Sequence, residues 1–90
     1  MYRIKFTHRF KKSLRLCVRR GLDHLKMQAV IELLQKTGTL PSEYLPHQLL
    51  GKHKHMMEAH IQPDWLIVWE VDNEELILYL IDTVTHSDLF

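Results

Sequence analysis

The 90-residue sequence has one cysteine, Cys17, and only three glycines and three prolines. A single thiol cannot form an internal disulfide, which excludes a disulfide-stapled secreted fold and favours a reducing compartment. The longest unbroken apolar runs, Trp65–Trp69 and Leu76–Ile81, are too short to cross a bilayer. The N-terminal residues are charged and contain no apolar signal segment. These absences predict a small soluble cytoplasmic protein with no membrane partner.

Charge is distributed unevenly along the chain, with few acids near the N-terminal end and no lysine or arginine near the C-terminal end, although the net charge is only +1. Residues 1–26 carry nine of the twelve lysines and arginines and one acid, Asp23. Residues 64–90 carry seven acids and no lysine or arginine. A basic end can meet a polyanion or an acidic partner, but it can also be a solvated helix face.

The composition and the apolar spacing predict one domain, 1–90, with an α+β fold. The apolar fraction of 46% and the charged fraction of 26% are ordinary for globular proteins and exclude a disordered chain. Helical and strand periodicities are grouped rather than alternating, which favours an N-terminal strand, a helical hairpin, then an antiparallel sheet of three or four strands. The expected elements are a strand over Met1–Phe6, helices over His8–Arg20 and about Leu22–Lys36, a loop over Ser42–Gly51, and strands over Trp65–Val71 and Glu75–Thr83.

Ionisable side chains gather near the expected strand ends and turns. His47 lies in an expected loop, and Asp64 lies in the break before a strand. Glu58 and His60 are two residues apart on a possible strand and would therefore face the same side. His86 follows the last strand closely. If the C-terminal strands are neighbours, His60, Asp64 and His86 can converge in one cleft.

Such a cluster suits the cleavage of RNA without a metal. That reaction needs a base for the 2′-hydroxyl proton, an acid for the leaving 5′-oxygen, and groups that hold the phosphate. Imidazole serves the first two because it titrates near neutral pH, and each general acid or base is typically worth ~10²–10⁴ in rate. A metal site of His53, His55, Glu58 and His60 is the competing interpretation. It lacks the established ligand spacings, so no metal or other cofactor is expected.

A series of short motifs runs through the C-terminal half. Its members are His47-Gln48-Leu49, Gly51, Glu58-Ala59-His60-Ile61, Pro63-Asp64-Trp65-Leu66-Ile67-Val68 and Thr85-His86-Ser87-Asp88-Leu89-Phe90. In this order and spacing the series resembles the YafQ-type branch of the RelE superfamily, bacterial type II toxins that are ribosome-associated mRNA endoribonucleases. The expected N-terminal strand and helical hairpin fit the same architecture, so the resemblance covers the whole chain.

The resemblance implies a RelE-like fold and a metal-independent, ribosome-dependent endoribonuclease that acts on mRNA and is held inactive by a cognate antitoxin. It implies catalytic roles for His47, His60, Asp64 and His86. Among these, His86 is the first choice for the general acid, and His47 or Asp64 for the base. The residues expected to contact the substrate are Glu58, Phe90, Lys52 and Lys54.

The basic N-terminal end then has two possible uses. Arg9, Lys12, Arg15 and Arg19 on the first expected helix can bind ribosomal RNA, because several contacts to phosphate give strong, salt-sensitive binding. The same side chains can hold an acidic antitoxin segment that folds on contact. The two uses would compete, which offers a simple mechanism of inhibition.

The sequence departs from the family pattern where two arginines usually face the phosphate. Asp82 and Met57 occupy those positions, and Val84 replaces a usual glycine. Loss of one donor to a developing oxyanion costs about 2.7–4 kcal/mol in other enzymes, and Asp82 could repel the phosphate. Either the basic segment Lys52–His55 supplies the charge instead, or the protein is a catalytically weak or inactive binding module for antitoxin or ribosome.

Overall fold

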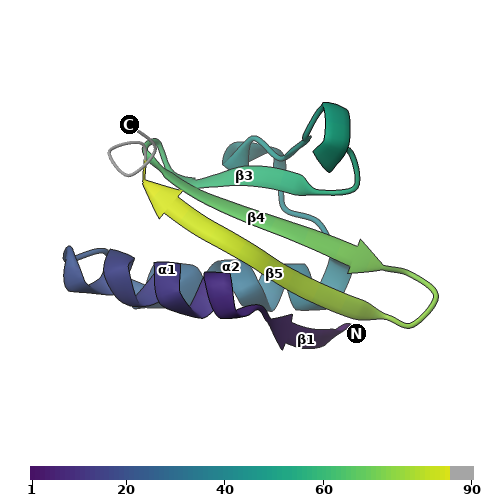
Figure 1. Cartoon of the computed structure of the whole chain (residues 1–90), viewed down its shortest axis with the longest axis horizontal. Helices are drawn as coiled ribbons and strands as arrows, with labels where there is room; N and C mark the ends of the chain where they lie inside the picture. The colour runs from purple at the N-terminus through teal and green to yellow at the C-terminus, as the bar shows by residue number, and fades with distance from the viewer. Residues whose placement is uncertain (86–90) are drawn as a thin grey trace.

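The computed structural model describes residues 1–85, in which two helices precede most of a five-stranded sheet (Figure 1). His86 and Phe90, both expected at the site, lie outside the described residues. The elements in chain order are β1 (Arg3–Phe6), α1 (His8–Arg19), α2 (His24–Thr37), the 3₁₀ turn η1 (Ser42–Tyr44), β2 (His47–Gln48), the 3₁₀ turn η2 (Gly51–His53), β3 (Met57–Gln62), β4 (Trp65–Asp72) and β5 (Ile77–Thr85).

The strand order in the sheet is β1-β5-β4-β3-β2. β1 pairs with β5 in parallel, whereas the other three pairings are antiparallel. The predicted α+β class and the order of strand, helical hairpin and strands are confirmed. The strand count is larger than predicted for two reasons. β1 joins the sheet at its edge, and a two-residue strand forms inside the segment 42–51 that was expected to be only a loop.

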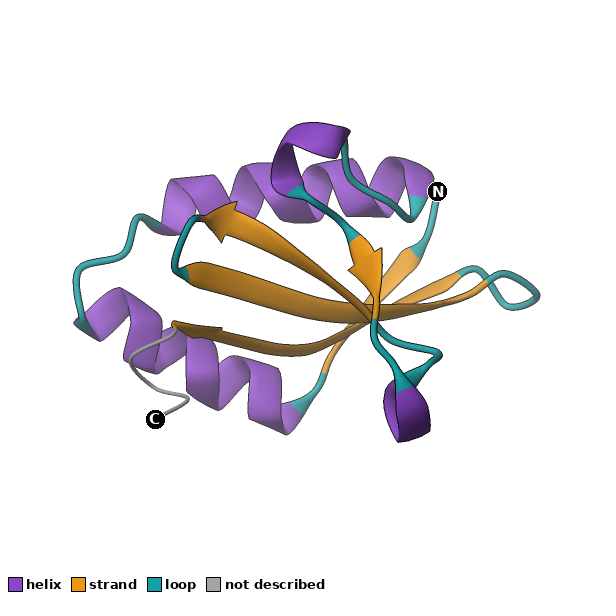
Figure 2. Ribbon diagram, turned by 90° about the horizontal axis from the view of Figure 1, so that it is seen from above, coloured by secondary structure: helices purple, strands orange, loops and turns teal. Residues whose placement is uncertain are grey.

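Both helices begin at side-chain caps and cover one face of the sheet (Figures 1 and 2). The Thr7 hydroxyl accepts a hydrogen bond from the Phe10 N–H at 3.1 Å, and the Asp23 carboxylate accepts one from the Leu25 N–H at 2.9 Å. α2 therefore begins after Asp23, two residues later than predicted. It ends at Gly38, whose φ of 78° is the left-handed conformation that glycine tolerates best. Neither of the two helices is long and apolar enough to cross a membrane.

The core lies between the helices and the sheet. Trp65 and Trp69 are both fully buried there, as predicted, and Cys17 is buried beside them. The Trp65 indole N–H donates to the Thr83 hydroxyl at 2.8 Å, and that hydroxyl donates to the Leu66 carbonyl at 2.7 Å. This buried bridge links β4 to β5 and thereby helps to fix which residues of the two strands lie opposite one another.

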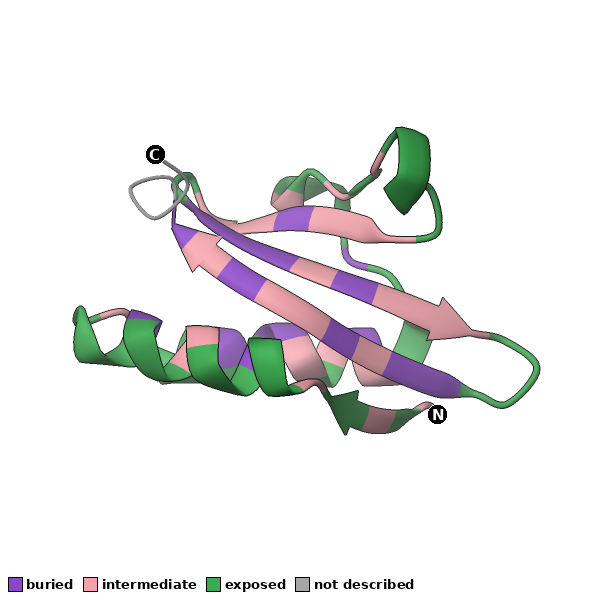
Figure 3. Cartoon of the chain, viewed as in Figure 1, coloured by how far each residue is buried: buried purple, intermediate pink, exposed green. Residues whose placement is uncertain are grey.

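The face of the sheet opposite the helices, called here the helix-free face, carries the polar side chains of the strands. Trp65 and Ile67 point into the core, so the alternation of a strand turns Val68 to the other side. Figure 3 shows the corresponding alternation of buried and half-buried residues along β4 and β5. The helix-free face is therefore the surface on which the candidate residues of β3 are presented.

Candidate active site

One row of residues crosses the helix-free face from β2 to β5. His47 pairs with Glu58, Glu58 with Val68, and Val68 with Asp82. Side chains directly opposite one another on neighbouring strands share a face, so this cross-strand row presents two ionisable groups on one side of Val68 and one on the other. Adjacent strands lie about 4.8 Å apart, which places Glu58 and Asp82 roughly 10 Å from each other.

His47 and Glu58 form an ion pair at one end of the cross-strand row. The Nε2 atom of His47 lies 3.1 Å from Oε1 of Glu58, and its Nδ1 atom lies 3.0 Å from the Leu45 carbonyl oxygen. A carbonyl and a carboxylate both accept hydrogen bonds, so the ring can donate to both only in its doubly protonated form. The ring remains about half exposed, with 48% of its surface accessible, so a substrate can reach it. In this form His47 is a cation and a proton donor.

His60 and Asp64 lie further along β3 and in the turn that follows. His60 is opposite Leu66 and lies two residues along β3 from Glu58 of the cross-strand row. Its Nδ1 atom donates to the Pro63 carbonyl at 3.2 Å. Asp64 is exposed in the β3–β4 turn, and its carboxylate has no hydrogen bond to another described residue. Both residues are thus at the same end of β3. The predicted convergence with His86 falls outside the described residues.

Lys52 and Lys54 lie in and just after η2, beyond the short strand β2. Both side chains are exposed, and the Gln48 side-chain amide donates to the Lys54 carbonyl. His53 and His55 are exposed in the same segment and do not gather with Glu58 and His60. Within residues 1–85, no group of three or more histidine, cysteine, aspartate or glutamate side chains could hold a metal ion.

A second ion pair, which the sequence analysis missed, occupies the other end of the cross-strand row. Nε of Arg9, in the first turn of α1, lies 3.0 Å from Oδ2 of Asp82. The sequence analysis placed Arg9 only on a basic helix surface. No local pattern links it to Asp82, because the parallel pairing of β1 with β5 brings these distant segments together. The Asp82 carboxylate that was expected to repel a phosphate is therefore neutralised by a guanidinium.

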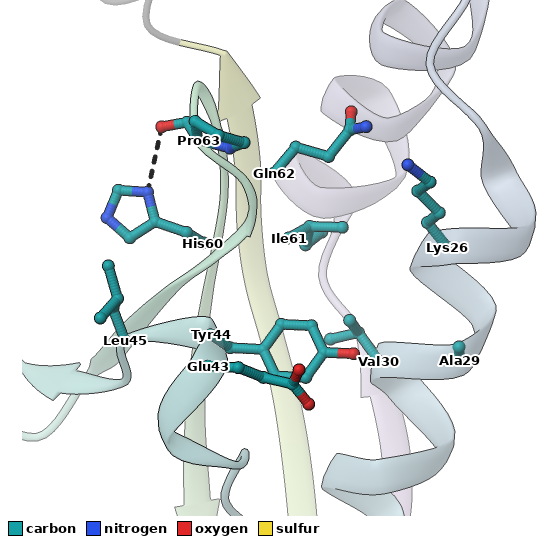
Figure 4. Close-up of a pocket in the computed structure, with 10 residues that line it drawn as sticks. All are labelled: Lys26, Ala29, Val30, Glu43, Tyr44, Leu45, His60, Ile61, Gln62 and Pro63. Atoms are coloured by element: carbon teal, nitrogen blue, oxygen red, sulfur yellow. Dashed lines mark hydrogen bonds between the residues drawn. The ribbon is translucent and has the colours of Figure 1, made fainter.

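A hollow of about 600 Å³ lies on the other side of β3, against α2 (Figure 4). It is lined mainly by apolar groups, including Val30 and Ile61, with Tyr44 projecting into it. In Figure 4 the His60 ring lies on the side of β3 away from Lys26. Lys26, Glu43 and His60 also line the hollow, but neither of the two residues His47 and Glu58 does, and the cross-strand row is the better candidate for a catalytic surface.

Comparisons with known proteins find relatives that match nearly the whole chain. The model of a family described as a bacterial toxin of type II toxin–antitoxin system, YafQ, matches residues 2–90. The mRNA interferase toxin YafQ of Escherichia coli K12 is 31% identical over 88 residues, which cover 97% of this chain and 94% of the relative.

Solved structures of similar proteins have the same fold. A metal-bound toxin from Helicobacter pylori has a TM-score of 0.88 and 32% identity, and the match covers 100% of both chains. The Escherichia coli DinJ-YafQ toxin–antitoxin complex contains a chain with a TM-score of 0.85 and 30% identity, and the match covers 99% of this chain and 97% of that one.

Proposed function

The chain belongs to the YafQ family of bacterial type II toxins and is an endoribonuclease of the mRNA interferase class, and from this premise we propose that it cleaves mRNA on the ribosome by metal-independent acid–base catalysis. Its partner is a cognate antitoxin. The observation that carries the proposal is the His47–Glu58 ion pair, with its 3.1 Å contact on the helix-free face of the sheet. This face presents a half-exposed imidazole, a cation and proton donor when protonated, where a phosphate can approach.

The hydrogen bonds of His47 favour a division of roles. Its ring nitrogens lie within hydrogen-bond distance of two acceptors, so His47 in its doubly protonated form is suited to hold the phosphate and the charge that develops on it. Asp64, exposed at the end of β3, is then the base for the 2′-hydroxyl proton, and His60 positions the substrate beside it. His86 is the general acid that protonates the leaving 5′-oxygen, so one proton is taken and one is returned in each cleavage.

The exposed basic side chains of α1 are the proposed docking surface for the antitoxin or ribosomal RNA. Lys12, Arg15 and Arg19, called here the α1 basic surface, are all exposed. Arg15 and Arg19 also border a shallow apolar depression of about 460 Å³ beside Leu14 and Val18. Phosphates can bind the cations, whereas an acidic amphipathic antitoxin segment can use the cations and the depression together.

Cleavage by the purified protein on ribosomes that carry a defined mRNA tests the proposal. We expect His47→Gln to lower the cleavage rate by roughly 10²–10³, the usual cost of losing one donor to a developing oxyanion. Glu58→Gln removes the partner of the imidazolium, and a hydrogen bond to a charged group is worth ~1.5–3 kcal/mol, so we expect a loss of roughly 10- to 100-fold. Glu32→Gln, an exposed carboxylate on α2, is the matched control and should cleave at the wild-type rate.

Treating the toxin with a chelator, and removing the chelator before ribosomes are added, tests the metal-independent chemistry. Full activity after this treatment is the expected result. A loss of activity that added metal restores would contradict metal-independent catalysis, and wild-type activity in His47→Gln would contradict the assignment of the site.

A further inference from the structure

Arg9 is held at the helix-free face by two sets of contacts. Its Nε atom lies 3.0 Å from Oδ2 of Asp82, whose other oxygen accepts the Thr83 backbone N–H at 2.9 Å. The Thr7 hydroxyl ties the start of α1 to β5 just before Asp82, because it lies 2.8 Å from the Leu80 carbonyl and 3.0 Å from the Ile81 carbonyl. The first turn of α1 is therefore fixed beside Asp82, so Arg9 is presented there by the fold itself.

The guanidinium of Arg9 is anchored by one edge and open at the other. The Arg9 side chain is 78% exposed, whereas Asp82 is only 14% exposed. The ion pair uses Nε, and the two Nη groups have no hydrogen-bond partner among the described residues. These Nη groups carry the planar pair of N–H donors that matches two oxygens of a phosphate.

Asp82 lies in the cross-strand row, two strands from Glu58. The two ends of the row thus carry a guanidinium and an imidazole, each beside a carboxylate. The two carboxylate residues are about 10 Å apart across Val68, so the two basic groups lie farther apart than that. An extended, regularly charged strand laid across the sheet can contact both cations. If the Arg9–Asp82 ion pair only stabilised this edge of the sheet, the Nη groups of Arg9 would not need to face solvent.

We propose that Arg9 binds a phosphate of the mRNA next to the scissile bond, and that Asp82 is a positioning residue that orients the guanidinium. The inference rests on the proposed cleavage of RNA at this face. It identifies α1 as the source of the cation that is missing from position 82 itself. No covalent step is added, because Arg9 holds the phosphate while other groups transfer the protons.

Single-turnover cleavage tests the proposal, with the toxin in excess over ribosomes that carry a defined mRNA. At saturating toxin, we expect Arg9→Gln to lower the rate constant by roughly 10²–10³. Arg9→Lys keeps the charge but loses the planar pair of donors, so its rate constant should lie between those of Arg9→Gln and the wild type. Lys36→Gln removes an exposed charge at the end of α2 and should cleave at the wild-type rate constant. Circular dichroism and Tm establish that each variant is folded.

Asp82→Asn separates a positioning role from a structural one. We expect it to lower the rate constant by roughly 10-fold when Arg9 is present, because the anchor of a charged group is lost. In the Arg9→Gln background the same change should have no further effect. A purely structural pair would instead lower Tm and leave the rate constant unchanged.

Three results would overturn the inference while leaving mRNA cleavage intact. They are a wild-type rate constant in Arg9→Gln, a change in the half-saturating toxin concentration alone, and an equal effect of Asp82→Asn with and without Arg9. The second result would assign the guanidinium to ribosome binding instead. If the wild-type protein itself makes no cut, the proposed function fails, and this inference fails with it.

Discussion

The buried bridge between Trp65 and Thr83 gives a prediction whose size follows from the structure. Both residues are 0% exposed, and the Trp65 N–H has the Thr83 hydroxyl as its acceptor at 2.8 Å. Thr83→Val keeps the side-chain volume but removes that acceptor. A buried donor left without a partner costs about 1–3 kcal/mol. We therefore expect the free energy of unfolding to fall by about 1–3 kcal/mol, and Tm by roughly 4–8 °C for each kcal/mol.

A double-mutant cycle with Trp65→Phe isolates the hydrogen bond from other effects of the substitution. Phenylalanine keeps an aromatic ring in the core but has no N–H, so in this background Thr83→Val leaves no indole donor unsatisfied and removes only the hydrogen bond from the hydroxyl to the Leu66 carbonyl. Thr83→Val should then cost less free energy in the Trp65→Phe background than in the wild type. We expect the two changes to be coupled by about 1 kcal/mol or more.

Urea denaturation followed by far-UV circular dichroism measures all four proteins of the cycle. Equal m-values would indicate that the substitutions change stability and not the extent of unfolding. The reasoning would be refuted if Thr83→Val cost the same free energy with tryptophan and with phenylalanine at position 65. It would also be refuted if the single Thr83→Val variant were as stable as the wild type.

Two further predictions concern the backbone and the α1 basic surface. Gly38→Ala should lower Tm more than Gly21→Ala does. Both glycines have a positive φ, which costs an alanine about 1–2 kcal/mol. A Cβ at Gly38 would also lie 2.9 Å from the Tyr2 hydroxyl, whereas a Cβ at Gly21 meets nothing within 4 Å. Equal Tm values for the two variants would contradict this. Changing all three residues of the α1 basic surface to glutamine should reduce the slope of log affinity for ribosomes against log salt by about 2–3, since each lost phosphate contact removes roughly one unit; an unchanged slope would exclude that surface from binding RNA.

The order and type of the main elements could be predicted from the sequence because each carries a local signal. Thr7 and Gly38 mark the ends of helices, and the buried tryptophans of β4 mark a core strand. The short strand β2 has two residues, which is too few to show a period. The parallel edge formed by β1 gives no local signal at all, since pairing between distant segments is decided by packing.

The motif series could propose residues for the candidate site, but it could not predict the contacts between them. The motif series identified His47 and Glu58 separately, and only the register of β2 with β3 brings them to 3.1 Å. Arg9 and Asp82 form a contact for the same reason, through the register of β1 with β5. The sequence predicted a group of positive charges on the first helix. It could not distinguish Arg9, which pairs with Asp82, from the other arginines of that helix.

Mapping of mRNA 5′ ends in bacteria tests the central claim most directly. The toxin is induced alongside two reporter messages that differ only in whether the start codon is intact. We predict discrete cuts within the translated message, none in the untranslated one, and no cuts with His47→Gln or His86→Ala. Equal cutting of both messages would contradict cleavage on the ribosome. Absence of cuts with the folded wild-type protein present would contradict the account as a whole.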